Sequence, residues 1–423
     1  MKTRLMIRLD ALLGIPLCGL ANLLSWPWRL WRSPVSVRPE ETRRILVIKF
    51  LGMGSVLLAS PVLQRLRKAF PDARIDFLTF GMNGDIVRRL PGVDRVLAVN
   101  EASPWTLFAS VPGLLWRLRQ QRYDVVIDLE FYSRLSCLVS WGSGARQRIG
   151  FFVRGRWRGS LLTNTVFFNA TLPFSQAVAA LLHPLGLAVS ADDEPIRPKI
   201  SEVEKREADQ RLGDMGVLGE GTLVVVNVNA SDLCDERRWP EERFAEFVSR
   251  FPAEVAGVDQ LVFIGLEGEK ETVSKVLTHI DPSVRPICLD LAGRTTIVEL
   301  IALLERAALM VSNDGGPLHL AAALGLPTVS FYGPETPALY GPVGKNHLVY
   351  YSRHWCSPCL SVYNGKIAWC DGENECMRAI TVEEVLQGTK VFCREKVGLA
   401  PPWNRRAKMS DSGRQESRAE DVI

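Results

Sequence analysis

Short apolar runs alternate with amphipathic stretches along most of this chain, and this alternation restricts the possible folds more than any other feature. The first run, Arg44–Phe50 (RILVIKF), is rich in β-branched residues, and a helical pattern follows it from Val56 to Phe70. Runs of this kind are typical of strands that are covered on both faces of a parallel sheet. A repeated strand–helix–strand order requires right-handed crossovers and therefore predicts an α/β fold with parallel sheets.

The alternation occurs in two series, separated by a charge-rich helix that we expect at Glu202–Met215. The first series has further expected strands and helices at Arg74–Phe80, Arg95–Val99, Trp105–Gln121, Tyr123–Leu129 and Ser133–Trp141. The second has expected elements at Thr222–Val228, Pro240–Phe251, Gln260–Gly265, Glu267–His279, Ile297–Arg306, Leu309–Ser312, Gly316–Leu324 and Thr328–Phe331. A chain of 423 residues is long enough for two such cores. We therefore expect doubly wound domains at residues 41–200 and 201–390, and a tail at 391–423 whose polar end is disordered.

The leading segment, residues 1–40, has a different character. Ala11–Leu24 is almost wholly apolar, and a Trp-rich basic stretch follows it in place of the small-residue cleavage site of a signal peptide. The run is shorter than the roughly 20 residues of a spanning helix and is broken by Gly14 and Pro16. Tryptophans beside arginines are typical of the membrane interface. We therefore favour a monotopic anchor at the cytoplasmic face of a membrane, with a spanning helix and a buried helix as alternatives. The net charge of +4 is too small to indicate a nucleic-acid partner.

The segment after Leu309–Ser312 carries the clearest chemical signal. The expected strand ends at Asn313-Asp314, and Gly315, Gly316 and Pro317 open the next helix. Two glycines let a phosphate approach the backbone, and the N–H groups at a helix start favour an anion. His319 lies one turn further on, close enough to help bind that anion. The alternative is an ordinary strand–helix turn with Asp314 as its cap.

These residues also carry a family resemblance. Ser312–Gly325, with Pro327-Thr328 and Tyr332-Gly333-Pro334, resembles the donor-binding signature of the heptosyltransferase-like glycosyltransferase family 9, and the likeness runs from about Arg44 to Thr381. The resemblance implies a GT-B architecture, in which two Rossmann-like domains face each other across a cleft. It also implies inverting transfer from a nucleoside-diphosphate sugar, with ADP-sugar favoured, to a lipopolysaccharide or other envelope glycolipid. The chemistry of that family requires no metal.

Three residues match donor-binding positions of the family. The loop at Asn229-Ala230-Ser231 and the basic Arg237 resemble the part that contacts the donor phosphates, which implies that role for Ser231 and Arg237. A guanidinium would also stabilise the charge that grows on a departing diphosphate. Glu267 falls where the family has a ribose-binding carboxylate. The alternatives are a solvent-exposed Arg237 and a helix-capping Glu267.

The acceptor side departs from the family pattern at the position of the catalytic base. The loop Gly52-Met53-Gly54-Ser55 follows the first strand, and well-known members of the family have an aspartate after that second glycine. An unassisted serine cannot deprotonate an acceptor hydroxyl at neutral pH. We expect a carboxylate at the end of Tyr123–Leu129 to serve instead, with Glu130 preferred and Asp128 second, since a buried strand-end Asp128 is more often structural.

Four of the nine cysteines lie close together in the sequence, at Cys356, Cys359, Cys370 and Cys376. C-x₂-C followed by two further cysteines is similar to a metal-ligand pattern, although the second pair is spaced by five residues rather than two. We therefore predict a structural Zn²⁺ or iron–sulfur site here. Packed thiols and disulfides are the alternatives.

The sequence leaves two other functions open. Ser55 would also suit a catalytically weakened sugar-nucleotide-binding scaffold, and the double-Rossmann architecture is shared with nucleotide-sugar epimerases. An epimerase would consume the donor without an acceptor, and a scaffold would bind it without transfer.

Overall fold

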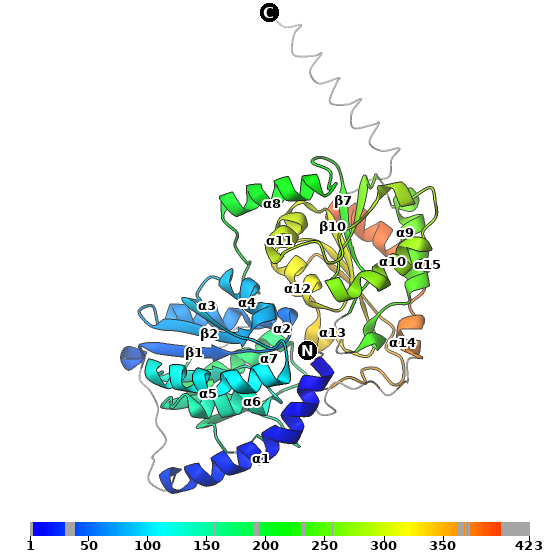
Figure 1. The fold of residues 1–423 in the computed structure, drawn as a ribbon. Helices are drawn as coiled ribbons and strands as arrows, with labels where there is room; N and C mark the ends of the chain where they lie inside the picture. The colour runs from blue at the N-terminus through cyan, green and yellow to red at the C-terminus, as the bar shows by residue number, and fades with distance from the viewer. Residues whose placement is uncertain are drawn as a thin grey trace, which may run out of the picture.

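The computed structural model describes residues 3–29, 39–155, 157–158, 160–188, 194–230, 234–255, 257–361, 368, 370 and 373–398. The described chain forms two six-stranded parallel sheets, which confirms the predicted α/β class (Figure 1). The first sheet consists of β1 (Arg44–Ile48), β2 (Arg74–Phe80), β3 (Arg95–Val99), β4 (Val125–Asp128), β5 (Gln147–Phe152) and β6 (Asn164–Phe167). The second consists of β7 (Leu223–Asn227), β8 (Gln260–Phe263), β9 (Cys288–Asp290), β10 (Leu309–Asn313), β11 (Thr328–Tyr332) and β12 (His347–Tyr351).

Helices cover both sheets. Those around the first sheet are α1 (Thr3–Arg29), α2 (Met53–Ala59), α3 (Pro61–Ala69), α4 (Gly81–Arg88), α5 (Pro104–Gln121), α6 (Arg134–Gly142) and α7 (Phe174–Ala179). The later helices are α8 (Glu202–Asp214), α9 (Glu241–Glu254), α10 (Lys270–Thr278), α11 (Ile297–Arg306), α12 (Gly316–Ala323), α13 (Pro337–Tyr340), α14 (Glu375–Arg378) and α15 (Val382–Phe392). Short 3₁₀ turns include η3 (Asp235–Arg237) and η4 (Glu267–Glu269).

The two sheets share one strand order. The first runs β3-β2-β1-β4-β5-β6, and the second runs β12-β11-β10-β7-β8-β9, which is the same order for its own six strands read from the other edge. In such sheets the connections leave the central pair of strands in opposite directions, so a crevice opens beyond their carboxyl ends. The crevices lie after β1 and β4 in the first sheet, and after β7 and β10 in the second.

The predicted helix Val56–Phe70 is divided into α2 and α3. The break lies at Ser60, and Pro61, which has no backbone N–H to donate, begins α3. Four strands were not predicted: β5 and β6 of the first sheet, and the edge strands β9 and β12 of the second. Of these, β6 alternates between half-buried and exposed residues, and β9 has three residues. Such strands lack the continuous apolar run that marks a central strand.

The N-terminal helix α1 is continuous through Gly14 and Pro16, so the expected interruption of the apolar run was wrong. It is 27 residues long, and its stretch Leu5–Trp26 is long and apolar enough to cross a membrane by length and composition. It packs along α6 (Figure 1), and this contact holds the helix through Pro16, because tertiary packing commonly outweighs local propensity. The polar end of the tail, residues 399–423, lies outside the described residues.

Candidate functional site

The two predicted binding loops meet where the domains touch. Helix α2, at the carboxyl end of β1, packs on α12, at the carboxyl end of β10. A Cβ placed on Gly54 would lie 2.4 Å from Cδ2 of His319, and one placed on Gly316 would lie 2.7 Å from Cε of Met53. The glycines therefore allow a backbone approach that a side chain would block, and they join the acceptor-side loop to the donor-side loop.

On the acceptor side, Glu130 is the centre of a buried hydrogen-bond network. Its Oε1 accepts from Lys49 Nζ at 2.8 Å and from the backbone N–H groups of Phe50 and Leu51 at 2.9 and 3.1 Å. The side chains of Lys49 and Glu130 are only 3% and 1% exposed. Glu130 thus fixes the first residues after β1 and lies at the crevice that the strand order predicts.

Ser55 belongs to the same network through one shared acceptor. The hydroxyl of Ser55 donates to the carbonyls of Leu51 and Gly52, both at 2.9 Å, and Lys49 Nζ donates to the same Leu51 carbonyl at 2.8 Å. Gly52, with φ of 82°, provides the left-handed turn that leads into α2. Ser55 and Glu130 therefore lie in one site, although 75 positions separate them in the sequence.

Asp128 has different surroundings. It is fully buried, forms an ion pair with Arg158, and accepts from the Ser136 hydroxyl at 2.9 Å and from the Glu130 N–H at 3.0 Å. Burial raises the pKa of Asp128 to about 6, against the opposing effect of Arg158. These contacts are those of a carboxylate that holds the strand end in place beneath Glu130.

On the donor side, Arg237 and Asp314 form a nearly buried ion pair. Nη2 of Arg237 lies 2.8 Å from Oδ2 of Asp314, and the side chains are 11% and 6% exposed. His319 is 4% exposed, and its Nε2 lies 3.7 Å from the other oxygen of Asp314. The ion pair brings the loop after β7 to the start of α12, so Arg237, Asp314 and His319, which the sequence analysis assigned to donor binding, lie together.

The start of α12 is half-buried, with Met53 and Gly54 packed against Gly316. Its N-cap residue, Gly315, makes no side-chain hydrogen bond, and Pro317 lies in the first turn. Asn313 holds the neighbouring loop in position: its Oδ1 accepts from Trp239 N–H, and its Nδ2 donates to the Val228 carbonyl, both at 2.9 Å. A helix start with an uncapped first turn is a favourable place for a phosphate group.

The remaining donor-side prediction concerns Ser231 and Glu267. Ser231 lies outside the described residues. Glu267 begins η4 after β8, with its side chain 74% exposed and its Oε1 2.7 Å from Lys270 Nζ. It also lies against Gly293, where an added Cβ would be 2.4 Å from Oε2 of Glu267, so a bulkier residue there would displace the carboxylate.

The predicted metal site at Cys356, Cys359, Cys370 and Cys376 is not supported. Within the described ranges, no group of three or more His, Cys, Asp or Glu residues is arranged to hold a metal ion. The thiols are nevertheless neighbours: burial raises the pKa of Cys376 to about 12, and the proximity of Cys359, Cys356 and Cys370 adds to the shift. Cys376 is buried, and Cys356, Cys359 and Cys370 are half-buried thiols near it.

Sequence reasoning missed two residues that organise the site. Lys49 was given no role, although a charged residue at the end of an apolar strand is a usable signal. Asn313 was treated as part of a motif, whereas its side chain connects the loops after β7 and β10.

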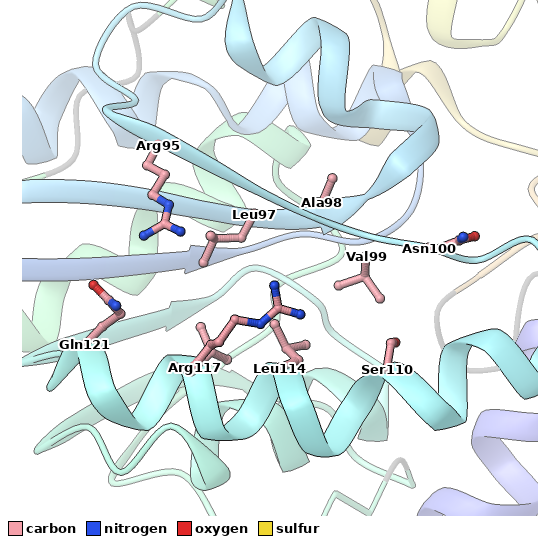
Figure 2. Close-up of a pocket in the computed structure, with 10 residues that line it drawn as sticks. Arg95, Leu97, Ala98, Val99, Asn100, Ser110, Leu114, Arg117 and Gln121 are labelled. Atoms are coloured by element: carbon pink, nitrogen blue, oxygen red, sulfur yellow. The ribbon is translucent and has the colours of Figure 1, made fainter.

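A second hollow lies away from the domain junction (Figure 2). It opens between β3 and α5, and the side chains of Arg95 and Arg117 project into it from opposite sides. Because β3 is the edge strand of the first sheet, this hollow is separate from the loops described above.

Two six-stranded Rossmann-like sheets with a shared junction are the arrangement of the GT-B architecture, which nucleotide-sugar glycosyltransferases share with nucleotide-sugar epimerases. Comparison with known proteins identifies the family. The family model for glycosyltransferase family 9 (heptosyltransferase) matches residues 113–366, which is more than half of the chain. The chain therefore belongs to glycosyltransferase family 9 and is a glycosyltransferase.

Individual relatives agree with this assignment. The chain is 27% identical over 311 residues to lipopolysaccharide heptosyltransferase 2 of Escherichia coli K12, covering 71% of this chain and 85% of that protein. It is 25% identical over 328 residues to lipopolysaccharide heptosyltransferase 1 of Pseudomonas aeruginosa, covering 75% and 86%.

Solved structures confirm the GT-B fold. The structure of E. coli ADP-heptose lipopolysaccharide heptosyltransferase II matches with a TM-score of 0.68 at 23% identity, over 84% of this chain and 99% of that one. The E. coli heptosyltransferase WaaC with ADP matches with a TM-score of 0.58 at 19% identity, over 82% and 99%.

Proposed function

We propose that this enzyme transfers heptose from ADP-heptose to a lipopolysaccharide-core or related envelope glycolipid acceptor, with inversion at the anomeric carbon. The similarity to lipopolysaccharide heptosyltransferases, one of them solved with ADP, supports the donor and the acceptor class. The observation that carries the proposal is the meeting of the Gly54 loop with the His319 loop at the crevices of both sheets. In this division residues 41–200 bind the acceptor and residues 201–390 bind the donor.

The donor diphosphate would lie at the start of α12. The first-turn N–H groups, the Arg237 guanidinium and the His319 ring would stabilise the negative charge that develops on departing ADP. Burial lowers the pKa of Arg237, and Asp314 and Glu335 more than reverse this, so Arg237 stays cationic throughout. Ser231 would add a hydroxyl to the phosphates, and the exposed carboxylate of Glu267 would accept from the ribose hydroxyls.

The acceptor hydroxyl would be activated from the other domain. Glu130 is the carboxylate that we propose as the base, since Lys49 and two backbone N–H groups all engage Oε1 and hold the group in one orientation. Asp128 would act as a positioning residue through its bond to the Glu130 backbone. With the base in one domain and the leaving-group site in the other, the two would lie on opposite sides of the anomeric carbon, as an inverting displacement requires.

The N-terminal helix would place the enzyme at its acceptor. Its exposed side chains are mainly large and apolar, including Leu12, Leu20, Leu23 and Trp26 at 71%, 55%, 64% and 62% exposure. Transferring one such side chain from water to an apolar phase contributes about 1.5–3 kcal/mol. We therefore infer a peripheral or monotopic enzyme at the cytoplasmic face of the cell membrane.

Ligand-dependent thermal stability tests the donor assignment. ADP and ADP-heptose should raise the melting temperature, because a ligand that binds only the folded state stabilises it by RT ln(1 + [L]/Kd), while UDP and GDP at equal concentration should have less effect. Arg237→Ala should reduce the shift, and Arg95→Ala, in the separate hollow, serves as the control. An equal response to all three nucleotides would contradict the adenine assignment.

A further inference from the structure

The second domain makes a further contact with the first through an aromatic residue, Tyr340. This residue ends the short helix α13, which follows β11 and lies at the junction of the domains (Figure 1). Its ring stacks on that of Phe174, the first residue of α7 in the first domain, with 5.2 Å between the ring centroids and 29° between the planes. Phe174 is fully buried, so the stack is anchored in the core of the first domain.

On the donor side, Tyr340 is held next to the loop that we propose for the donor diphosphate. The hydroxyl of Tyr332, the last residue of β11, donates to the Tyr340 carbonyl at 2.8 Å. Strand β11 pairs with β10, and the Asp314 N–H donates to the carbonyl of Phe331 at 3.3 Å. Tyr340 is therefore attached to the strand that lies beside the Asp314 loop.

On the acceptor side, further rings lead from Tyr340 to the proposed base. The ring of Phe174 meets that of Phe131 edge-on, with centroids 6.1 Å apart, and Phe131 directly follows Glu130. Phe131 is 4% exposed, and Lys49 Nζ lies 6.0 Å from the centroid of its ring. The rings of Tyr340, Phe174 and Phe131 therefore form a continuous series from the donor-side loop to the residue next to the base.

The electrostatic surroundings of the Tyr340 phenol also belong to both domains. Burial raises the pKa of the phenol well above its usual value, and ionisable groups raise it further: Glu335 and Asp314 from the second domain, and Tyr132 and Glu130 from the first. The phenol is therefore uncharged. The two domains can share this ring without placing another charge beside the base.

A stack at this place adds a constraint that the glycine contact lacks. The close approach of Gly54 to His319 determines how near the two domains come at that point. It does not by itself determine how the domains are rotated, because a single point of contact fixes a distance and not an orientation. Orientation matters for the transfer, since a displacement of about 1 Å between reacting groups can reduce a rate about 10²-fold.

We propose that Tyr340 is a positioning residue for the transfer, whose ring, stacked on Phe174, sets the place of Glu130 relative to the donor diphosphate. The proposal rests on the proposed transferase function and assigns to it a residue of the donor domain that acts on the acceptor side. The stack is what spans the junction, so the ring carries the effect and the hydroxyl does not. Donor binding does not depend on Tyr340, because Arg237 and the start of α12 lie within the second domain.

Substitution of either ring tests the proposal kinetically. Tyr340→Leu and Phe174→Leu should each lower kcat about 10–100-fold, with KM for ADP-heptose and the calorimetric affinity for ADP unchanged. Tyr340→Phe keeps the ring and should keep the wild-type kcat. The double variant Tyr340→Leu/Phe174→Leu should lose no more than the slower single variant, because the effects of residues that act as one unit are not additive.

Tyr350 provides a matched control. Its ring also stacks on a phenylalanine, Phe331, with centroids 6.0 Å apart, but both residues belong to the second domain. Tyr350→Leu should lower the melting temperature and leave kcat per folded molecule unchanged. It therefore separates the loss of a buried ring from the loss of the contact between the domains.

Hydrogen exchange in the ligand-free protein tests the contact without any transfer. The N–H groups of Phe50 and Leu51 donate to Glu130, so their exchange reports how firmly that carboxylate is held. Exchange at these N–H groups should be about two- to tenfold faster in the two leucine variants at the junction, since an aromatic pair contributes a free energy of that size. It should be unchanged in the phenylalanine variant and in the control.

The outcomes separate this proposal from the transferase function. Wild-type kcat in Tyr340→Leu, an equally low kcat in Tyr340→Phe or in Tyr350→Leu, or multiplied losses in the double variant would overturn the positioning role. Unchanged exchange in the leucine variants at the junction would overturn it as well. Faster exchange in those variants, with no transfer by the wild type, would support the contact and refute the proposed transferase function.

Discussion

The proposed base gives the sharpest prediction, because the structure separates its chemical role from its structural one. Glu130→Gln preserves the shape of the side chain and the oxygen that accepts from the Phe50 and Leu51 N–H groups. It removes the carboxylate that would take the proton from the acceptor. General-base catalysis contributes about 10²–10⁴ in rate, so kcat should fall by that factor, or about 2.7–5.5 kcal/mol of barrier.

The same substitution has a stability cost that can be calculated separately. Lys49, 3% exposed, would lose its anionic partner and keep only neutral acceptors, the amide oxygen at position 130 and the Leu51 carbonyl at 2.8 Å. Breaking a buried ion pair from one side costs about 3–5 kcal/mol, and the retained hydrogen bonds place the expected cost near the lower end. A loss of about 3 kcal/mol corresponds to roughly 6–12 °C in the melting temperature of a domain of this size.

The double variant Lys49→Met/Glu130→Gln distinguishes the two effects. Removing both partners of a buried pair is often close to neutral for stability, so this variant should recover most of the melting temperature. Its kcat, measured per folded molecule with saturating donor and acceptor, should stay as low as that of Glu130→Gln. Recovery of the wild-type kcat together with stability would show that Glu130 only holds the loop, and the assignment of the base would be wrong.

Four further outcomes are expected. Arg237→Lys should keep a charge but lose the bidentate fork of the guanidinium, so the affinity for ADP, measured by calorimetry, should fall about tenfold. The fall should be larger in Arg237→Ala, and unchanged affinity in both variants would refute the phosphate role. Gly54→Ala should force the two domains apart and lower kcat/KM, whereas Gly113→Ala, where a Cβ meets nothing within 4 Å, should leave it unchanged; equal kcat/KM in both would refute the close-approach argument. The pKa of Asp128 is about 6 in the folded state, against 3.8 for an ordinary aspartate. Protonation of Asp128 therefore stabilises the folded state fully below pH 3.8, and this stabilisation is lost as the pH rises through 6. Asp128→Asn should remove that component from the melting temperature measured against pH, and an unaltered pH profile would contradict the shift. Leu20→Glu/Leu23→Glu on the exposed face of α1 should release the enzyme from vesicles containing anionic lipid in a flotation assay without changing its melting temperature, and retained flotation would refute the anchor.

Central elements could be predicted from the sequence because their own residues determine them. The bounds of β2 and α11 agree with the expected ranges, since a continuous apolar run or a helical period begins and ends within each of them. The bounds of the edge strand β3 agree as well. The edge strands β6, β9 and β12 were missed because their formation depends on a neighbouring strand more than on their own composition. The inner strand β5 was missed too, since its sequence QRIGFF begins with two polar residues and contains a glycine. The length of helix α1 was underestimated for a related reason. Asp10 and Gly14 hold it against Arg134 of α6, about 120 residues further along the chain.

The site was predictable as a set of strand ends but not as a set of contacts. The strand order places the segments at Gly54, Glu130, Arg237 and Asp314 at the two crevices, and a motif interpretation can reach that point. The pairing of Lys49 with Glu130 and of Arg237 with Asp314 joins residues that are 81 and 77 positions apart. Such pairs depend on the packing of whole domains. The cysteine spacing illustrates the opposite error, because among the described residues this pattern typical of metal ligands does not form a group arranged to hold a metal ion.

Acceptor-dependent release of ADP is the measurement that tests the central claim most directly. The purified full chain would be incubated with ADP-heptose, with and without a heptose-deficient lipopolysaccharide acceptor, and both ADP and the acceptor mass would be followed. Transfer between the two domains predicts ADP release only when acceptor is present, together with one heptose added to the acceptor. Consumption of the donor without acceptor, as by an epimerase, or donor binding without any addition to the acceptor, as by a scaffold, would contradict it.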